Sequence, residues 1–328
     1  MEPAQAAASV PLWAWAFFAG FVLVVLVLDL FVLHRRAHEV SVKEAGLWSA
    51  VWVAAGLGFA GLLWAWRGGG AAQAYLAGYL VEKSLSLDNV FVFAIIFSAF
   101  AIPLRYQHRV LMAGIIGALI MRAAFILAGV ALLEAFHPVS YVFGTVLLWA
   151  AFRMLRGSHP QPENNRALKA LRRALPVTDQ LHGQSFLVRY GGRVLVTQLM
   201  LALIVVEVTD VIFAIDSIPA VLAVTTDTFV VYTSNVFALL GLRALYFLLA
   251  GAAVRFRYLQ PGLAVILAAV AVKLVTADFW TIPAWASPAF IAAVLAAVAV
   301  LSVRDRANAS AGARSPKTPG RQEKPLSV

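Results

Sequence analysis

The sequence predicts an all-α integral membrane protein whose chain crosses the bilayer about nine times. Hydrophobic residues make up 62% of the chain and charged residues 13%, whereas a soluble globular protein has roughly 25% charged residues. Apolar runs of about 20 residues, the length that a membrane-spanning helix needs, recur along the chain. Between them lie short polar gaps that hold most of the Lys and Arg residues. These gaps set the predicted boundaries of the helices.

The apolar runs give the predicted spans in order along the chain. They are placed near residues 11–33, 46–66, 72–100, 108–134, 138–156, 194–223, 229–251, 259–278 and 286–303. The N-terminal stretch "MEPAQAAASV" lacks the basic segment of a signal peptide, so we expect the first run to remain as a membrane helix. Residues 1–306 are therefore expected to form one transmembrane domain.

The basic residues predict how the chain is oriented in the membrane. Every second gap, beginning with the one after the first span, contains several Lys or Arg residues, whereas the other side offers only Arg67. Because cytoplasmic loops carry the Lys and Arg excess, the N-terminus is predicted outside and the C-terminus inside. The formal net charge of +10 thus reflects topology, and nucleic acid is not an expected partner.

Two polar segments are expected outside the membrane. Residues 157–190 form a basic cytoplasmic loop, with a short surface helix around "NRALKALRRAL". This loop is either a solvated connector or a surface for anionic lipid. Residues 307–328 are rich in Ser, Pro and Gly, and we expect them to be a disordered cytoplasmic tail.

The chain contains a candidate internal repeat. "DNVFVFAI" from Asp88 is similar to "TDVIFAI" from Thr209, and "RAAFILAG" from Arg122 is similar to "RALYFLLAG" from Arg243. Spans three to five are therefore predicted to repeat in spans six to eight, although apolar helices also resemble one another by chance. Because each copy has three spans, the copies would be inverted, a plan in which transporters place their site near the membrane midplane.

Acidic residues interrupt two of the predicted spans. Glu82 and Asp88 lie in the third, and Glu207, Asp210 and Asp216 lie in the sixth. Each charge costs roughly 2.5–3.5 kcal/mol at the centre of a membrane helix, so five together cost on the order of 12–18 kcal/mol. A fold is stable by only about 5–15 kcal/mol. We therefore expect these acids to be paired, protonated, solvated in a cavity or bound to cations.

Helical spacing constrains how these acids can meet. Glu207 and Asp210 are three residues apart and share a helix face. The two acids of the third span are six residues apart, as are Asp210 and Asp216, and a regular helix points such pairs in different directions. Their convergence would need unwound backbone, for which residues 84–86 and the stretch around Pro219 are candidates.

The side-chain chemistry of this acidic cluster favours a hard divalent cation. Carboxylate and amide oxygens suit magnesium, calcium or manganese better than copper or zinc. The chain has no cysteine, so it offers no thiolate site, and no nucleophile–base pair suggests an enzyme. The predicted metal ligands are Glu82, Asp88, Asn89, Glu207, Asp210 and Asp216, helped by Ser217 or Asn235.

An alternative explanation is that the acids form buried ion pairs. The basic residues available within the spans include Lys83, Arg122, Arg243 and Lys273. Buried pairs of this kind add little net stability, which favours a binding site over a purely structural cluster. We interpret Arg122 and Arg243 as possible counter-charges that hold the empty site together.

The motifs around the acids are similar to those of the TerC/Alx family of bacterial inner-membrane proteins. They are "EKSLSLDNVFVFA", "EVTDVIFAIDSIPAV" and "TSNVFALLGLRALYFLL", and the resemblance covers most of residues 11–303. The segment "HRRAHEVSVKEAGLWSAVWV" resembles the Alx-type branch. The resemblance implies a multi-pass protein of the bacterial inner membrane that is associated with tellurium resistance. For the Alx-type branch it implies manganese export.

Together these observations predict an exporter of Mn²⁺ that works by alternating access, with Mn²⁺ as the transported ion and no organic cofactor. Its expected partners are the divalent cation and the lipid bilayer, and its oligomeric state is open. Proton exchange through the same carboxylates is a further hypothesis. The alternative is a membrane scaffold or assembly factor in envelope or tellurite stress, acting through the 157–190 loop and the tail. Export of an organic cation would need a roomier, aromatic-lined site.

Overall fold

The structure is a computed structural model and is almost entirely helical. It describes residues 10–28, 41–136, 138–156, 176–178, 183–190, 193–252, 258–276, 280, 283 and 285–313. Within them the helices are α1 (Leu12–Leu28), α2 (Val42–Arg67), α3 (Gly69–Ala99), α4 (Leu104–Ala135), α5 (Val139–Leu155), α7 (Gln198–Leu222), α8 (Thr228–Leu240), α9 (Leu242–Ala252), α10 (Leu259–Val275) and α11 (Ala286–Ala313). The predicted all-α membrane fold is confirmed.

Each predicted span coincides with a described helical segment, if α8 and α9 are taken as one. Four segments, which are α2, α4, α7 and residues 228–249 of α8 and α9, are long and apolar enough to cross a membrane. Shorter apolar helices account for α1, α5, α10 and residues 286–302 of α11. Two departures from the predicted spans stand out: a turn at Gly241 separates α8 from α9, and α11 continues to Ala313. The helix thus enters the predicted tail, of which residues 314–328 lie outside the described residues.

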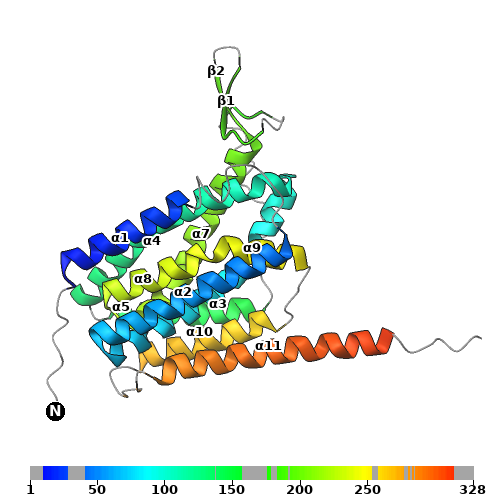
Figure 1. Cartoon of the computed structure of the whole chain (residues 1–328). Helices are drawn as coiled ribbons and strands as arrows, with labels where there is room; N and C mark the ends of the chain where they lie inside the picture. Colours follow the sequence, from blue (N-terminus) through cyan, green and yellow to red (C-terminus); the bar gives the residue numbers. More distant parts are fainter. Residues whose placement is uncertain are drawn as a thin grey trace, which may run out of the picture.

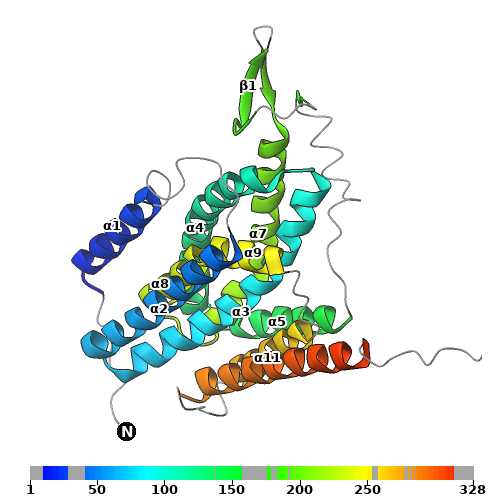
Figure 2. The same cartoon turned by 45° about the vertical axis from the view of Figure 1, so that its right-hand side comes forward.

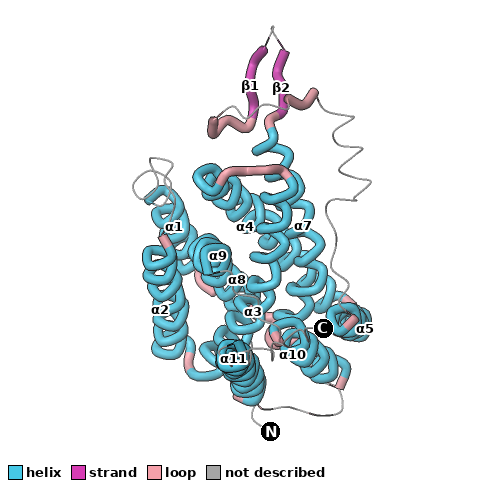
Figure 3. The backbone as a smooth tube through the Cα atoms, turned by 90° about the vertical axis from the view of Figure 1, so that its right-hand side faces the viewer, coloured by secondary structure: helices cyan, strands magenta, loops and turns pink. Residues whose placement is uncertain are grey.

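A β-hairpin precedes α7 and projects away from the helices (Figure 3). Strands β1 (Leu187–Tyr190) and β2 (Arg193–Val196) pair antiparallel. The span predicted to start near residue 194 begins as α7 at Gln198, and the hairpin before it was not predicted. Thr197 caps α7 by accepting a hydrogen bond from the Met200 amide at 3.4 Å. The predicted surface helix of the 157–190 loop lies outside the described residues.

The helices pack around α3, α4, α7 and α8 (Figures 1 and 2). Helix α3 packs against α8, α4 packs against α7, and α5 pairs with α10. Helix α2 covers α3 and α9, and α11 lies against α3 and α10. If α3, α4 and α5 are exchanged for α7, α8–α9 and α10, the α3–α8 and α4–α7 contacts exchange with each other and the α5–α10 contact maps onto itself. Such a pattern is what the predicted repeat requires, and both the repeat and the membrane orientation stay predictions.

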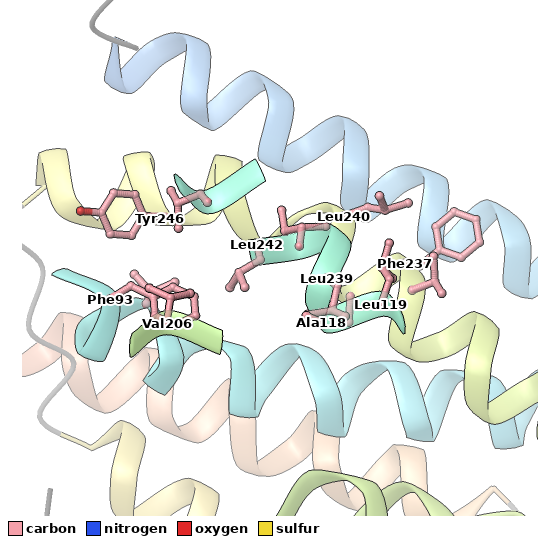
Figure 4. Packing of buried hydrophobic residues seen from close by; sticks show 14 of the residues in the cluster. Phe93, Ala118, Leu119, Val206, Phe237, Leu239, Leu240, Leu242 and Tyr246 are labelled. Carbon is pink, nitrogen blue, oxygen red and sulfur yellow. The ribbon is translucent and has the colours of Figure 1, made fainter. Parts of the chain in front are cut away.

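Buried apolar side chains fill the space between these helices, whereas many large apolar side chains on the outside are exposed. Figure 4 shows part of the core, in which Phe93 and Val206 lie near Tyr246 while Leu239 and Phe237 lie farther along the bundle. Among the exposed side chains, Trp13, Trp64 and Trp66 come from adjoining ends of α1 and α2. Trp13 and Trp66 contact each other with ring centroids 5.4 Å apart. An apolar exterior with tryptophans at helix ends is typical of a protein that faces lipid.

Helices α3 and α7 run without interruption through their acidic residues. The predicted unwound stretches at residues 84–86 and around Pro219 are therefore wrong. Pro219 lies in the last turn of α7, where the missing N–H removes one bond and the helix ends directly after Leu222. Because α7 stays regular, Asp210 and Asp216 point toward different neighbours.

Candidate functional site

A single buried arginine joins the central helices. Arg122 of α4 is 1% exposed, and its Nη1 contacts Glu82 of α3 and donates to Asn235 Oδ1 of α8 at 2.8 Å. Its Nη2 lies 3.2 Å from Asp210 Oδ1 and its Nε lies 3.4 Å from Asp210 Oδ2, so the guanidinium holds that carboxylate by both oxygens. Ser217 Oγ accepts from Nη1 at 3.3 Å. We call these five residues the Arg122 network.

Local helix geometry explains why these side chains meet. Asp210 and Ser217 are seven residues apart, which is close to two helical turns, so both project from one face of α7 toward Arg122. Asn235 donates from Nδ2 to the Val231 carbonyl at 3.0 Å, which leaves its Oδ1 free to accept from the guanidinium. The planar fork of arginine suits several acceptors at once.

One glycine, Gly78, allows the backbone of α3 to lie close to α7 and α8 about one turn before Glu82. A Cβ atom at Gly78 of α3 would lie 2.9 Å from Ser234 Oγ of α8 and 3.0 Å from Val221 Cγ1 of α7. A larger residue at this position would force the Ser234 hydroxyl and the Val221 side chain to move, so glycine permits α3 to lie close to both partners. Close packing through small residues is common in membrane helices.

The Arg122 network has more negative than positive charge. Its two carboxylates, Glu82 and Asp210, share one guanidinium, which leaves a formal net charge of −1 if both acids are ionised. Glu82 is 0% exposed, and its Oε2 has no hydrogen-bond partner among the described residues. A buried carboxylate oxygen without a donor is costly, so the arrangement can accept a further cation or donor.

Asp216 faces a different partner. It lies on α7, and Arg153 Nη2 of α5 is 3.5 Å from its Oδ2. Both side chains are partly exposed, at 16% for Asp216 and 30% for Arg153. A cavity of about 40 Å³ adjoins this pair, and Asn89, Glu82 and Ser217 also line it. Asp216 and Glu82 thus lie at the same cavity although only Glu82 contacts Arg122.

Glu207 occupies a third environment. It lies one turn before Asp210 in α7 and is half-buried against Gly117 of α4, where its carboxylate occupies the space that a Cβ atom would need. The structure therefore does not place Glu207 in the Arg122 network. The side chain of Asp88, the remaining predicted acid, lies outside the described residues.

Arg243, the other candidate counter-charge, and the two lysines of the predicted spans lie in separate places. Arg243 of α9 is buried and, together with Asp210, lines a small cavity of about 10 Å³. Lys83 donates from Nζ to the Ala238 carbonyl at 3.4 Å, beside the turn between α8 and α9. Lys273 of α10 donates to Ser287 Oγ of α11 at 3.0 Å.

The structure thus brings together part of the predicted site. Glu82 and Asp210 meet at Arg122 with Ser217 and Asn235, while Asn89 and Asp216 line the adjoining cavity. Among the described side chains, no group of three or more Asp, Glu, His or Cys residues is arranged to hold a metal ion. The metal site therefore stays a prediction.

Sequence reasoning missed the contact of Arg153 with Asp216. The available signal was the position of Arg153 itself, a charged residue at the end of an otherwise apolar predicted span. Such a residue needs a partner or the membrane surface. Which acid it reaches depends on how α5 packs against α7, and no local pattern encodes that packing.

The chain is similar to a known family of membrane proteins. The integral membrane protein TerC family matches residues 68–310, a range that includes every residue of the Arg122 network. The chain belongs to the TerC family. This result confirms the family resemblance seen in the acidic motifs. No solved structure matches the chain.

Relatives of this TerC-family protein cover nearly the whole chain. An uncharacterized membrane protein of Myxococcus xanthus is 46% identical over 92% of this chain and 96% of its own length. A protein of Photorhabdus laumondii, whose name reads "Putative membrane-bound redox modulator Alx", is 43% identical over 88% of this chain and 94% of its own. The protein of that name from Escherichia coli K12 is 44% identical over 82% and 87% respectively. Their similarity supports the Alx-type branch within the family.

Proposed function

We propose that this TerC-family protein exports a divalent cation, Mn²⁺ in the first place, across the bacterial inner membrane. The observation that carries the proposal is the Arg122 network, where Glu82 and Asp210 from two helices share one buried arginine. These two carboxylates share a single guanidinium, which leaves one negative charge uncompensated, and ionisable residues inside a membrane bundle commonly mark ion pathways. Their oxygens, with those of Ser217 and Asn235, are hard donors that suit Mn²⁺.

Arg122 determines the conformation of the proposed site when no cation is bound. In the absence of cation its guanidinium neutralises half of the formal charge of Glu82 and Asp210 and holds α3, α4, α7 and α8 together. An arriving divalent cation would take over these oxygens, and the guanidinium would have to move away. Because the four helices belong to the two predicted inverted repeats, that exchange would bias their relative position, as alternating access requires.

The choice of Mn²⁺ rests on the family resemblance together with the oxygen-rich site. The Alx proteins are named as redox modulators, and a transporter that sets the level of a redox-active cation is compatible with that name. A thiol mechanism within this chain is excluded, because the sequence contains no cysteine.

The central test replaces Asp210 with Asn. In bacteria that lack other manganese exporters, the parent protein should restore growth in high Mn²⁺, and D210N at the same membrane level should not. The matched control is D227N, because Asp227 pairs with Arg67 at 2.6 Å on the edge of the bundle and Asn retains helix-capping ability. Full Mn²⁺ tolerance with D210N would contradict the proposal.

Metal selectivity needs a second measurement. For the purified protein in detergent, we expect Mn²⁺ to raise the unfolding temperature more than Mg²⁺, Ca²⁺ or Zn²⁺ does, since a ligand that binds only the folded state stabilises it. D210N should lose that increase. An equal response to all four ions would argue against Mn²⁺ as the substrate.

A membrane scaffold in envelope or tellurite stress is the second candidate. The β1–β2 hairpin favours it, because the hairpin projects from the bundle and carries exposed Leu187 and Val194 (Figure 3). The double variant L187S/V194S distinguishes the two functions. A scaffold that uses the hairpin would lose stress resistance, whereas an exporter would retain Mn²⁺ tolerance.

A further inference from the structure

The cavity beside the Arg122 network has features of a binding site in its own right. It measures about 40 Å³ and lies between α3, α5, α7 and α10, with Asn89, Asp216 and Arg153 among its polar lining residues. A cavity needs roughly 10–15 Å³ to accept one water molecule, so this one has room for a small ion or a few waters. Its lining includes carboxylate, amide and hydroxyl groups, all of which provide oxygen ligands.

Glu82 connects this cavity to the Arg122 network. One of its oxygens, Oε1, contacts Arg122, while Oε2 has no hydrogen-bond partner among the described residues. The residue is 0% exposed and lines the cavity. An ion or water in the cavity would supply the missing partner.

Arg153 is the one positive charge in the cavity lining that the structure describes, and it is held weakly. Its single described contact with Asp216 is 3.5 Å long, at the outer limit of a hydrogen bond. The guanidinium carbon also lies 4.8 Å from the centroid of the Trp149 ring, a cation–π contact that does not involve Asp216. Arg153 lies in the last turn of α5 and is 30% exposed, so its long side chain can leave Asp216 and reach toward the polar membrane interface.

We propose that this cavity is an entry site for the transported divalent cation and that Arg153 competes with the cation for Asp216. On arrival the cation binds the carboxylate of Asp216 and the free oxygen of Glu82, with the Asn89 amide oxygen and water as further ligands. The Arg153 guanidinium withdraws onto Trp149. This inference rests on the proposed export function and adds a residue that sets how tightly the cation enters.

Charge balance supports the exchange. With Asp216 and Glu82 ionised and Arg153 in place, the lining carries a formal charge of −1. When one divalent cation replaces the Arg153 guanidinium, the formal charge of the lining changes from −1 to zero, provided that Arg122 stays with Asp210. A second cation or a trivalent one would leave the cavity positive, which disfavours its entry into a low-dielectric region.

Mn²⁺ binding to the full-length protein in detergent, measured by isothermal titration calorimetry, tests this inference. We expect R153Q to lower the dissociation constant of Mn²⁺ about three- to tenfold, because the competing charge is gone, and R153K to have a smaller effect. The matched control is R156Q, since Arg156 lies at the same end of α5 but does not line the cavity. Its guanidinium carbon lies 4.3 Å from the centroid of the Phe152 ring. R156Q should bind Mn²⁺ like the parent protein.

A second pair of variants ties the effect to Asp216. D216N should weaken Mn²⁺ binding, and R153Q should have no further effect in the D216N background, because the two residues would act on one contact. Each variant is first required to elute as a single species at the parent position in size-exclusion chromatography. R153Q and R153K provide two independent chances to obtain a folded protein.

Each outcome has a definite meaning. If the parent protein binds Mn²⁺ and R153Q leaves the dissociation constant unchanged or raises it, the entry site is contradicted while the proposed export function stands. If R153Q tightens binding equally with Asp216 and with D216N, Arg153 acts only through long-range charge and the competition is contradicted. If the parent protein does not bind Mn²⁺, the proposed function and this inference both fail.

Discussion

Two arginine–carboxylate contacts in this protein use the same chemistry in different surroundings. Arg122 is 1% exposed and bonds to groups on α3, α7 and α8, whereas Arg153 is 30% exposed and, among the residues that the structure describes, contacts Asp216 and the face of Trp149. Burial and the number of partners decide what such a contact does. The first arrangement fixes four helices relative to one another, and the second can open without loss of the fold.

The difference follows from the free energy of leaving a charge alone. Removing one partner from a buried ion pair costs about 3–5 kcal/mol, because the remaining charge stays in a low-dielectric region. A partly exposed pair near a helix end costs less to break, because a long charged side chain can turn toward the polar membrane interface. The two arginines should therefore respond very differently to the same substitution.

The largest expected effect is that of R122Q. Glu82 and Asp210 would be left without their guanidinium, so we expect a loss of about 3–5 kcal/mol and little folded protein in the membrane. The measurement is thermal unfolding followed by fluorescence-detected size-exclusion chromatography. R122K, which keeps a charge but lacks the planar fork, should fall between R122Q and the parent. An unchanged unfolding temperature for R122Q would remove the contrast between the two arginines.

The next effect concerns Asn235, a neutral member of the Arg122 network. N235L preserves the approximate size of the side chain but removes the acceptor for Arg122 Nη1, which should cost about 1–3 kcal/mol. Ser234 is the matched control, since it is also buried on α8 but donates only to the Val231 carbonyl of its own helix. If N235L and S234A lower the unfolding temperature by the same amount, the contact between Asn235 and Arg122 contributes nothing specific to stability.

Glu207 allows a comparison with an acid that belongs to neither contact. G117A should displace its carboxylate from α4 with little change in the unfolding temperature, because that carboxylate is the far end of a flexible side chain and alanine favours the helix. G58A on α2 is the control, because a Cβ there meets nothing within 4 Å. A loss as large as that of R122Q, restored in the double variant G117A/E207A, would show that the Glu207 carboxylate is fixed in place and cannot move aside.

The smallest expected effect on stability is that of D216N. It breaks a part-exposed pair, so the free energy of unfolding should change by about 0–1 kcal/mol even though Mn²⁺ binding weakens. Thermal unfolding without added metal checks the first part. If D216N lowers the stability as much as R122Q does, the contact between Asp216 and Arg153 is needed for the fold. That result would contradict the proposed exchange of Arg153 for a cation.

Much of the fold was predictable because span length and basic gaps follow directly from bilayer thickness and membrane topology. The hairpin was missed although "LVRYGGRVLV" places Gly-Gly between two β-prone runs, a recognised hairpin signal. Its apolar residues were counted as part of the following span. The unwound stretches were wrong because convergence of all the acids was assumed, whereas α7 stays regular and directs Asp210 and Asp216 to different helices.

The acids themselves could be found from sequence because a charge in an apolar run is costly wherever the helix lies. Their pairing could not, since Arg122 lies 40 residues from Glu82 and 88 from Asp210 along the chain. Contacts at such separations depend on how helices pack, including the close approach of α3 and α8 that Gly78 permits. The contact of Arg153 with Asp216 was missed for the same reason.

Neighbouring residues on α3 make contacts on two sides of that helix. Glu82 reaches Arg122 on α4, while Lys83 reaches the Ala238 carbonyl beside the turn that separates α8 from α9. Successive side chains of an α-helix point about 100° apart, so a rotation of α3 about its axis would disturb both contacts together. Loss of the Glu82–Arg122 contact would therefore also weaken the contact of Lys83 beside the Gly241 turn. Movement of that turn would in the same way disturb the contact between Glu82 and Arg122.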